Sequence, residues 1–310
     1  MAYRRVDRAR VMTLVENSIN PFLKKRENVR WQQPEEGVLL AEHGWAALIE
    51  TTANGKKHTL LLDAGLSETT LLHNMDRFKL DVMAIEAIVV SHGHGDHTGA
   101  LIGLLQRLGR PLPVFVHPAA FRERWTIPPD GPRRGPSGPK REKWEAAGAQ
   151  IVATEGPHQV FPGCVVSGGI PRHTDFEHPP RHYFYRENDA FHPETLPDDQ
   201  AVVVIVEGKG LLVVSGCAHA GIVNTVRYAQ AITGEPRVWA VAGGFHLAGA
   251  SQEVIAATVS GLQAAGPTLV APGHCTGFDA QRAIAAAMPA QFVLNVVGTV
   301  ISTHMEGEER

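Results

Sequence analysis

The segment 91–97 brings together residue types that bind metal ions. Its sequence, SHGHGDH, holds three imidazoles and one carboxylate within six residues, at His92, His94, Asp96 and His97. Imidazole nitrogens and carboxylate oxygens are the ligands that borderline divalent metals such as zinc prefer. The two intervening glycines let the backbone turn sharply, so that alternate side chains can point toward one place. The segment therefore predicts a metal site.

Later segments repeat a related pattern, in which an apolar run ends in glycine and a histidine follows. They carry His219, His246, His274 and, less clearly, His173. Each of these histidines, taken alone, is more typical of a core or loop position. Loops at the ends of strands in a layered fold gather on one edge, so the segments can converge on the first motif. Together they could complete one or two metal sites.

The composition excludes several classes of protein. The 310 residues suffice for one large α/β domain, which we expect over 1–310, and the net charge of −3 predicts neither nucleic-acid nor membrane partners. Three cysteines argue against a disulfide framework and for a reducing compartment. The basic segment 1–10 lacks the apolar core of a signal peptide, and the apolar run 201–218 is too polar to span a bilayer. We therefore expect a cytoplasmic protein.

Strands and helices are predicted to alternate around the motif. Strands are expected at 45–50, 59–62, 85–90, 113–116, 150–153, 201–206, 211–215, 238–242, 268–270, 292–296 and 299–302. Helices are expected from Ser67 to 78, from Asp96 or Thr98 to 108, and at 143–147, 222–232, 252–264 and 279–287. This mixture, with hairpins in both halves, predicts an α/β fold of mixed sheets with helices on their outer faces.

Two polar segments, 128–143 and 171–200, are predicted to be flexible loops without regular structure. The first is either a solvated loop or a flap that contacts anions through Arg133, Arg134, Lys140 and Arg141. The second has the length and composition of a lid or binding loop. Near the C-terminus, the apolar side chains of Val296, Val297, Val300 and Ile301 either close a sheet or face a partner chain.

The pattern His-x-His-x-Asp-His after a buried strand resembles the signature of the metallo-β-lactamase superfamily. Further segments are similar to one branch: VEN at 15–17, EHG at 42–44, LDAG at 62–65, GIPR at 169–172, DQA at 199–201, SGCAHAGIVNTV at 215–226, GGFHL at 243–247 and PGHCTG at 272–277. This branch, the superfamily II metal-dependent hydrolases, includes archaeal dihydropterin–ribofuranosylaminobenzene phosphate synthases. The resemblance extends over about residues 11–302 and implies a four-layer αββα sandwich with a metal site at one edge of its two sheets.

The resemblance also implies a set of metal ligands. It assigns His92 and His94 to a first metal, and Asp96, His97 and His274 to a second. His219 is favoured over His173 as the remaining ligand of the first metal.

Cys217 stands where many members of the superfamily have an aspartate that bridges both metals. A thiolate could bind or bridge zinc, or Cys217 could be a buried residue without metal contact. His246 is either a packing residue or a group near the substrate.

We expect a metal-dependent hydrolase that holds one or two zinc ions, with manganese or iron as other options. The expected small-molecule substrate is a phosphoester, a lactone or a similar ester. Asp96, His219 and His246 are the candidate catalytic residues, and Arg172 is a candidate contact for a phosphate group. One alternative, implied by the resemblance, is a transferase that joins a dihydropterin methyl diphosphate to a ribofuranosylaminobenzene phosphate. A second is a non-catalytic protein that binds a metabolite, against which the intact motif counts.

Overall fold

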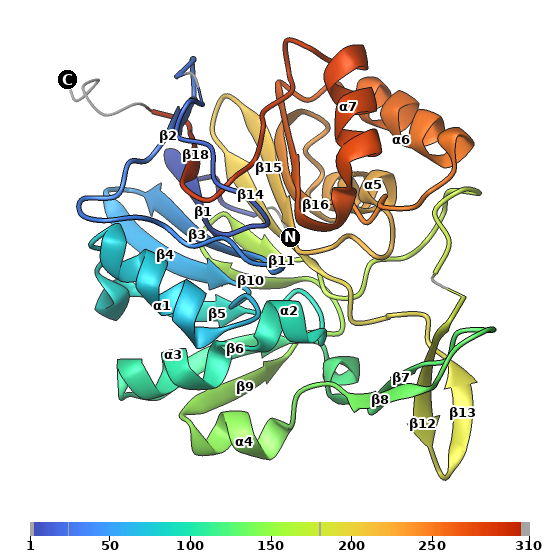
Figure 1. Ribbon diagram of the computed structural model, residues 1–310. Helices are drawn as coiled ribbons and strands as arrows, with labels where there is room; N and C mark the ends of the chain where they lie inside the picture. The colour runs from blue at the N-terminus through green and yellow to red at the C-terminus, as the bar shows by residue number, and fades with distance from the viewer. Residues whose placement is uncertain (1–2, 24, 180, 305–310) are drawn as a thin grey trace.

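Two large β-sheets packed face to face form the centre of the computed structural model, which describes residues 3–23, 25–179 and 181–304 (Figure 1). The first sheet has the order β2-β18-β1-β3-β4-β5-β6-β9. Its strands are β1 (Arg8–Val15), β2 (Val29–Trp31), β3 (Ala46–Ala53), β4 (Lys56–Leu62), β5 (Ala87–Val89), β6 (Leu112–Val116), β9 (Ala149–Ala153) and β18 (Thr299–Ser302).

The second sheet has the order β10-β11-β14-β15-β16-β17. Its strands are β10 (His158–Phe161), β11 (Cys164–Val166), β14 (Ala201–Val206), β15 (Gly210–Ser215), β16 (Val238–Gly244) and β17 (Leu269–Gly273). Both large sheets are mixed: β4, β5, β6 and β9 run parallel in the first, and β15, β16 and β17 run parallel in the second.

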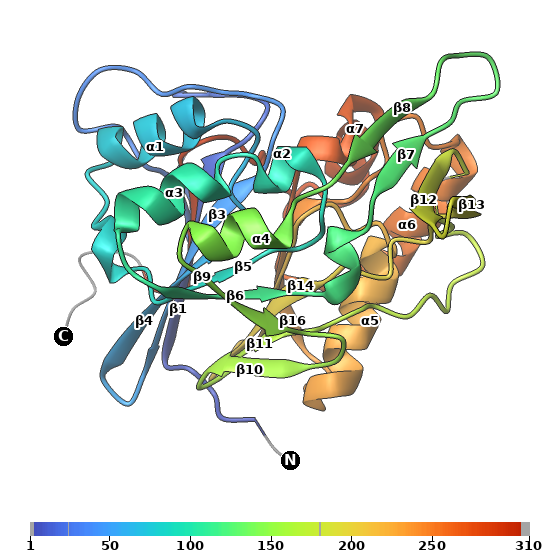
Figure 2. The same ribbon diagram turned by 90° about the horizontal axis from the view of Figure 1, so that it is seen from below.

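Helices cover the outer face of each sheet (Figures 1 and 2). On the first sheet these are α1 (Glu68–Arg77), α3 (Leu101–Leu108) and α4 (Arg141–Ala146). On the second they are α5 (Ile222–Thr233), α6 (Gln252–Ala265) and α7 (Phe278–Ala287). The expected four-layer αββα arrangement is therefore confirmed. None of the helices in the described part of the chain is long and apolar enough to cross a bilayer.

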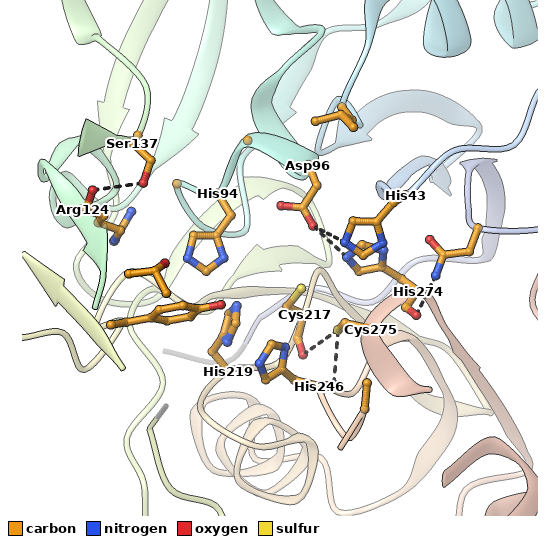
Figure 3. Close-up of a pocket in the computed structure, with 18 of the residues that line it drawn as sticks. His43, His94, Asp96, Arg124, Ser137, Cys217, His219, His246, His274 and Cys275 are labelled. Carbon is orange, nitrogen blue, oxygen red and sulfur yellow. Dashed lines mark hydrogen bonds and ion pairs between the residues drawn. The ribbon is translucent and has the colours of Figure 1, made fainter. Parts of the chain in front are cut away.

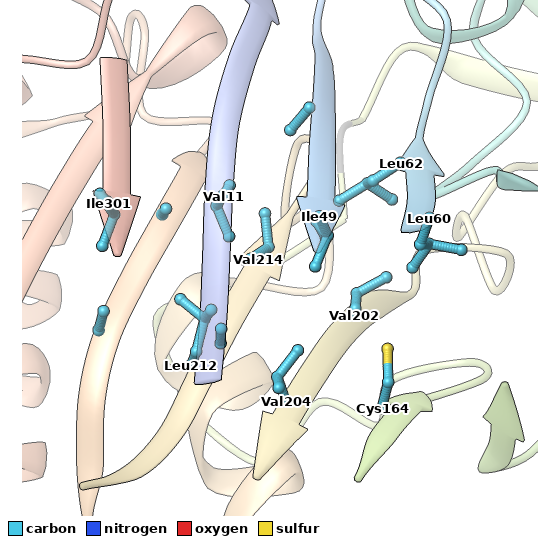
Figure 4. Close-up of a cluster of buried hydrophobic side chains, with 14 of the residues drawn as sticks. Val11, Ile49, Leu60, Leu62, Cys164, Val202, Val204, Leu212, Val214 and Ile301 are labelled. Atoms are coloured by element: carbon cyan, nitrogen blue, oxygen red, sulfur yellow. The ribbon is translucent and has the colours of Figure 1, made fainter. Parts of the chain in front are cut away.

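The core between the sheets explains the apolar runs of the sequence. Ile49 and Leu62 from the first sheet meet Val202 and Val214 from the second (Figure 4). Every residue of β14 and β15 is buried, because the opposite face of these strands packs under α5. Strands buried on both faces have continuous apolar sequences instead of alternating ones. Each such fully buried Val or Leu side chain contributes about 1.5–3 kcal/mol to folding.

The helix that follows the metal motif differs from the prediction. Asp96 and Thr98 do not cap a helix that runs to residue 108: a short α2 (Gly95–Thr98) has His94 at its N-cap, and α3 begins separately at Leu101. The helix is interrupted at Gly99, whose N–H donates to the carbonyls of both Gly65 and Gly95. A Cβ at Gly99 would lie 1.9 Å from the Leu66 carbonyl oxygen, so only glycine permits this contact. The carboxylate of Asp96 therefore stays available to the site.

Both segments that were predicted to lack regular structure contain strands. A small third sheet has the order β13-β12-β7-β8, formed by β7 (Arg124–Thr126), β8 (Arg134–Ser137), β12 (Tyr183–Glu187) and β13 (Ala190–Pro193). Aromatic contacts hold it together: the rings of Trp125 and Phe191 lie 5.6 Å apart, and the Arg133 guanidinium lies over Phe191. The predictions for 128–143 and 171–200 were wrong at these strands. The prolines and glycines of both segments predict loops, whereas the strands form by pairing, β8 with β7 and β12 with β13.

The segment 292–296, which was predicted to be a strand, does not form one. Phe292 forms only an isolated bridge with Val270, and the Val296 N–H donates to Thr299 Oγ1 in a turn. Strand β18 then enters the first sheet between β2 and β1, so Val300 and Ile301 close that sheet.

Candidate metal centre

The candidate ligands follow strands that run parallel within each sheet. Segment 91–97 follows β5, Cys217 and His219 follow β15, and His274 follows β17. The carboxyl ends of parallel strands lie on one edge of a sheet, and here the edges of both sheets meet. The side chains consequently point into one pocket from both halves of the chain (Figure 3).

Two groups of ligand atoms share Cys217. In the first, His92 Nε2 lies 3.0 Å from His94 Nδ1 and 3.2 Å from His219 Nε2. In the second, His97 Nε2 lies 3.1 Å from Cys217 Sγ and 3.2 Å from His274 Nε2. Asp96 Oδ2 joins the second group at 3.2 Å from His274 Nε2. His219, not His173, is therefore the histidine brought to His92 and His94. Cys217 lies between the groups.

This arrangement fits divalent metal ions. Two nitrogens bound to tetrahedral zinc at about 2.0–2.1 Å are about 3.3 Å apart, close to the spacings within both groups. Neutral imidazole nitrogens that face each other at such distances repel unless a cation or a proton lies between them. The mixed nitrogen, sulfur and carboxylate donors suit zinc best.

Burial keeps several imidazoles in the form that binds metals. It lowers the pKa of His92 and of His219 well below 6.5, with further lowering by neighbouring imidazoles. Burial, with help from the nearby Arg124 guanidinium, also lowers the pKa of His94 to about 4. Burial alone would raise the pKa of Asp96, but the hydrogen bond from His274 and the charge of His97 lower it. The first group therefore presents neutral imidazoles, and Asp96 presents an ionised carboxylate.

Asp63, which directly follows β4, orients His97. His97 Nδ1 donates to Asp63 Oδ2 at 2.7 Å, and both side chains are fully buried. Burial alone would lower the pKa of His97, but the Asp63 carboxylate outweighs it and raises the pKa to about 9. With the Nδ1 proton committed to Asp63, the proton that a metal ion would displace is the one on Nε2, which faces Cys217 and His274. A second hydrogen bond that fixes a ligand histidine in this way is usual in metal sites.

Glu16 and Asn17, which follow β1, hold the backbone of His274. Both carboxylate oxygens of Glu16 accept from the His274 N–H at 2.8 Å, and Asn17 Nδ2 donates to the His274 carbonyl at 2.9 Å. His274 needs this support because its φ of 50° lies in the left-handed region, which is unfavourable for a residue with a Cβ. Burial raises the pKa of Glu16 to about 8, in spite of these backbone hydrogen bonds.

Arg124 supports the turn at Gly93 in the metal motif, residues 91–97. Its guanidinium is buried and donates to Asp198 at 2.6 Å and to Glu194 at 3.1 Å. Asp198 in turn accepts from the N–H of Gly93, between two of the candidate ligands. This network ties the small third sheet, through β7, to the turn that presents His92 and His94.

Members of both ligand groups line a pocket of about 670 Å³. His43 stacks on His274 with ring centres 4.9 Å apart and lies 3.5 Å from Asp96. The Tyr183 ring lies 5.5 Å from that of His94, at the side formed by the third sheet. His246 lies at the mouth of the pocket, is exposed, and has its ring centre 4.0 Å from that of His219.

Several lining residues were missed by the sequence reasoning. They are Arg124, Tyr183 and, apart from its place in the EHG motif, His43. Asp63, Glu16 and Asn17 were noted only as parts of the LDAG and VEN segments. The signal available for Asp63 was its position directly after a buried strand beside the strand that carries the metal motif.

The residues expected to contact phosphate lie elsewhere. Arg172 is not among the described residues that line the pocket, and its guanidinium donates to the His219 carbonyl at 3.0 Å. The guanidinium of Arg133 lies over an aromatic ring, and Arg141 pairs with Glu145 on the surface. The basic segment instead reaches the pocket through Ser137 and Gly138 at the end of β8.

Comparisons with known proteins agree with the fold. A family model of the metallo-β-lactamase superfamily matches residues 40–228, so the chain belongs to this superfamily. It is 34% identical, over 246 residues, to the 7,8-dihydropterin-6-methyl-4-(β-D-ribofuranosyl)-aminobenzene-5'-phosphate synthase of Methanocaldococcus jannaschii, with 78% of this chain and 83% of the relative covered. Among solved structures, Tm1679, described as a metal-dependent hydrolase of the β-lactamase superfamily, matches with a TM-score of 0.75 and 22% identity, covering 94% of this chain and 98% of that one.

Proposed function

We propose that this protein is a metal-dependent transferase, which joins a dihydropterin methyl diphosphate to a ribofuranosylaminobenzene phosphate. The observation that carries the proposal is the 34% identity to the Methanocaldococcus jannaschii synthase over 78% of the chain. This similarity favours the transferase alternative over the hydrolase that the superfamily motif alone suggests. The likeness to Tm1679, at 22% identity, supports the fold and not an activity.

The residues of the site suit such a reaction. One metal ion would be held by His92, His94, His219 and Cys217. A second would be held by Asp96, His97, His274 and Cys217. When bound, the two ions would supply positive charge for the oxygens of a leaving diphosphate. In the transfer, a bond forms from the arylamine nitrogen to the pterin methylene carbon as the bond from that carbon to the diphosphate oxygen breaks.

The pocket provides for the rest of the chemistry. The incoming nitrogen must lose a proton, and His246, like His43, is an exposed imidazole of the pocket that belongs to neither ligand group. Its ring would take up that proton as a general base. Tyr183 and Trp125 line the side formed by the third sheet, where they offer flat apolar surface to an aromatic ring of a substrate.

The experiment is a panel of substrates given to the zinc-loaded protein. We expect the joined product, detected by mass, and release of diphosphate only when both the pterin diphosphate and the arylamine are present. His92→Ala should abolish both signals, whereas the surface variant Asp76→Asn should retain them. Release of diphosphate with the pterin substrate alone, or turnover of only bis(p-nitrophenyl) phosphate or a lactone, would replace the proposal with hydrolysis.

A further inference from the structure

The two ligand groups use Cys217 but leave a second thiol beside it. Cys275 directly follows the candidate ligand His274 and lines the same pocket as Cys217. The two sulfur atoms and a ring nitrogen of His246 all lie within 4.8 Å of one another. Thiols that are close together and reachable from a pocket are candidates for reversible oxidation.

The fold brings these cysteines together across a strand. Cys217 follows β15 and Cys275 follows β17, and β16 lies between the two strands. Gly244 ends β16 at this point, and a Cβ there would lie 2.7 Å from Cys275 Sγ and 3.2 Å from Cys217 Cα. Because glycine has no side chain, the two cysteines can approach each other over the end of β16.

Polar contacts hold the Cys275 sulfur in this position. It lies 3.6 Å from the carbonyl oxygen of Cys217, and the backbone N–H of His246 donates to it at 3.3 Å. A disulfide needs the sulfurs to come to about 2.05 Å, which requires a movement of less than about 3 Å from the present spacing. The third cysteine, Cys164, is fully buried in the core between the sheets.

We propose that Cys217 and Cys275 form a modification site, at which a hydroperoxide converts the two thiols into a disulfide. The Cys275 sulfur attacks the peroxide O–O bond, forming a sulfenic acid as hydroxide leaves. The Cys217 thiol then attacks that sulfur, the S–S bond forms, and the sulfenic oxygen leaves as water. With hydrogen peroxide, the two sulfurs give up two electrons and the two thiol protons end in two molecules of water. The disulfide withdraws Cys217 from both ligand groups, so bound metal is released.

The test exposes the zinc-loaded protein to hydrogen peroxide and follows thiols and metal. The thiol count of the denatured protein should fall from three to one, since Cys164 is shielded. A proteolytic peptide that joins the segments of Cys217 and Cys275 should appear. The bound metal should fall by about twofold or more, and a dithiol reductant with added zinc should restore it.

Two variants serve as controls. Cys164→Ser should respond as the wild type does, whereas Cys275→Ser should keep its metal at the same peroxide dose. Three surviving thiols, metal loss that is equally fast in Cys275→Ser, or a disulfide without metal loss would each overturn the proposal. None of these readouts depends on the transferase reaction, so a failure of the proposed function would leave their outcome unaffected.

Discussion

Replacement of Asp63 by asparagine should weaken metal binding by changing which ring nitrogen of His97 carries the proton. The carboxylate accepts three hydrogen bonds of 2.7 Å, from the N–H and the hydroxyl of Ser91 and from His97 Nδ1. In Asp63→Asn the amide oxygen can still face the Ser91 N–H, while the NH₂ group replaces the oxygen that faces His97. His97 then either keeps an Nδ1 proton without an acceptor or moves that proton to Nε2, where it blocks the metal.

The expected loss of metal affinity follows from these two states of His97. A buried donor without an acceptor costs about 1–3 kcal/mol, which corresponds to about 5- to 150-fold in a dissociation constant. Loss of a hydrogen-bond partner behind a metal ligand costs about 10- to 100-fold in affinity, which lies within that range. Competition with a chromophoric chelator at neutral pH measures the affinity, and Asp76→Asn, an exposed carboxylate paired with Arg107, is the matched control. An affinity of folded Asp63→Asn within about twofold of the wild type would refute the role of Asp63.

Further predictions address the support of the site and the metals. Asn17→Ala removes the hydrogen bond to the His274 carbonyl and should raise the metal dissociation constant by about 2- to 10-fold in the same chelator assay, whereas an unchanged constant would remove Asn17 from the support of His274. Arg124→Met leaves buried carboxylates unpaired and should lower the free energy of unfolding by about 3–5 kcal/mol in urea denaturation; a loss below about 1 kcal/mol would contradict this. Cys217→Asp should retain metal that Cys217→Ala loses, as measured by elemental analysis, and equal retention would show that Cys217 is no ligand. Removal of metal by a chelator should lower the melting temperature in calorimetry, since the ions bind the folded state, and an unchanged value would contradict that coupling.

The elements with strong apolar patterns were predicted well from the sequence. The hairpin of β14 and β15 and the helices α5, α6 and α7 lie within one or two residues of their expected bounds. Strand β1 was missed because Arg8 and Arg10 interrupt its apolar run. In the structure Arg10 lies directly opposite Glu50 on β3 and donates to it at 2.7 Å, so its charge is paired across the sheet.

The candidate ligands could be identified from the sequence because each stands in a short motif at the end of an apolar run. Residues that support the ligands carried a weaker signal. Glu16 acts on the backbone N–H of His274, which is 258 positions away, and Asp63 acts through His97. Such contacts depend on how the strands pair across the sheets, which local spacing does not specify. The same holds for Arg172. Its motif suggested a contact with phosphate, and nothing in the sequence indicated its hydrogen bond to the His219 carbonyl.

Metal content is the most direct test of the central claim, that two groups of ligands meeting at Cys217 hold a dinuclear centre. Elemental analysis of protein purified under metal-replete conditions should find about two equivalents of transition metal per chain. His92→Ala should retain about one equivalent, because the group of Asp96, His97 and His274 stays intact. Less than about one equivalent in the wild-type protein would contradict the dinuclear centre.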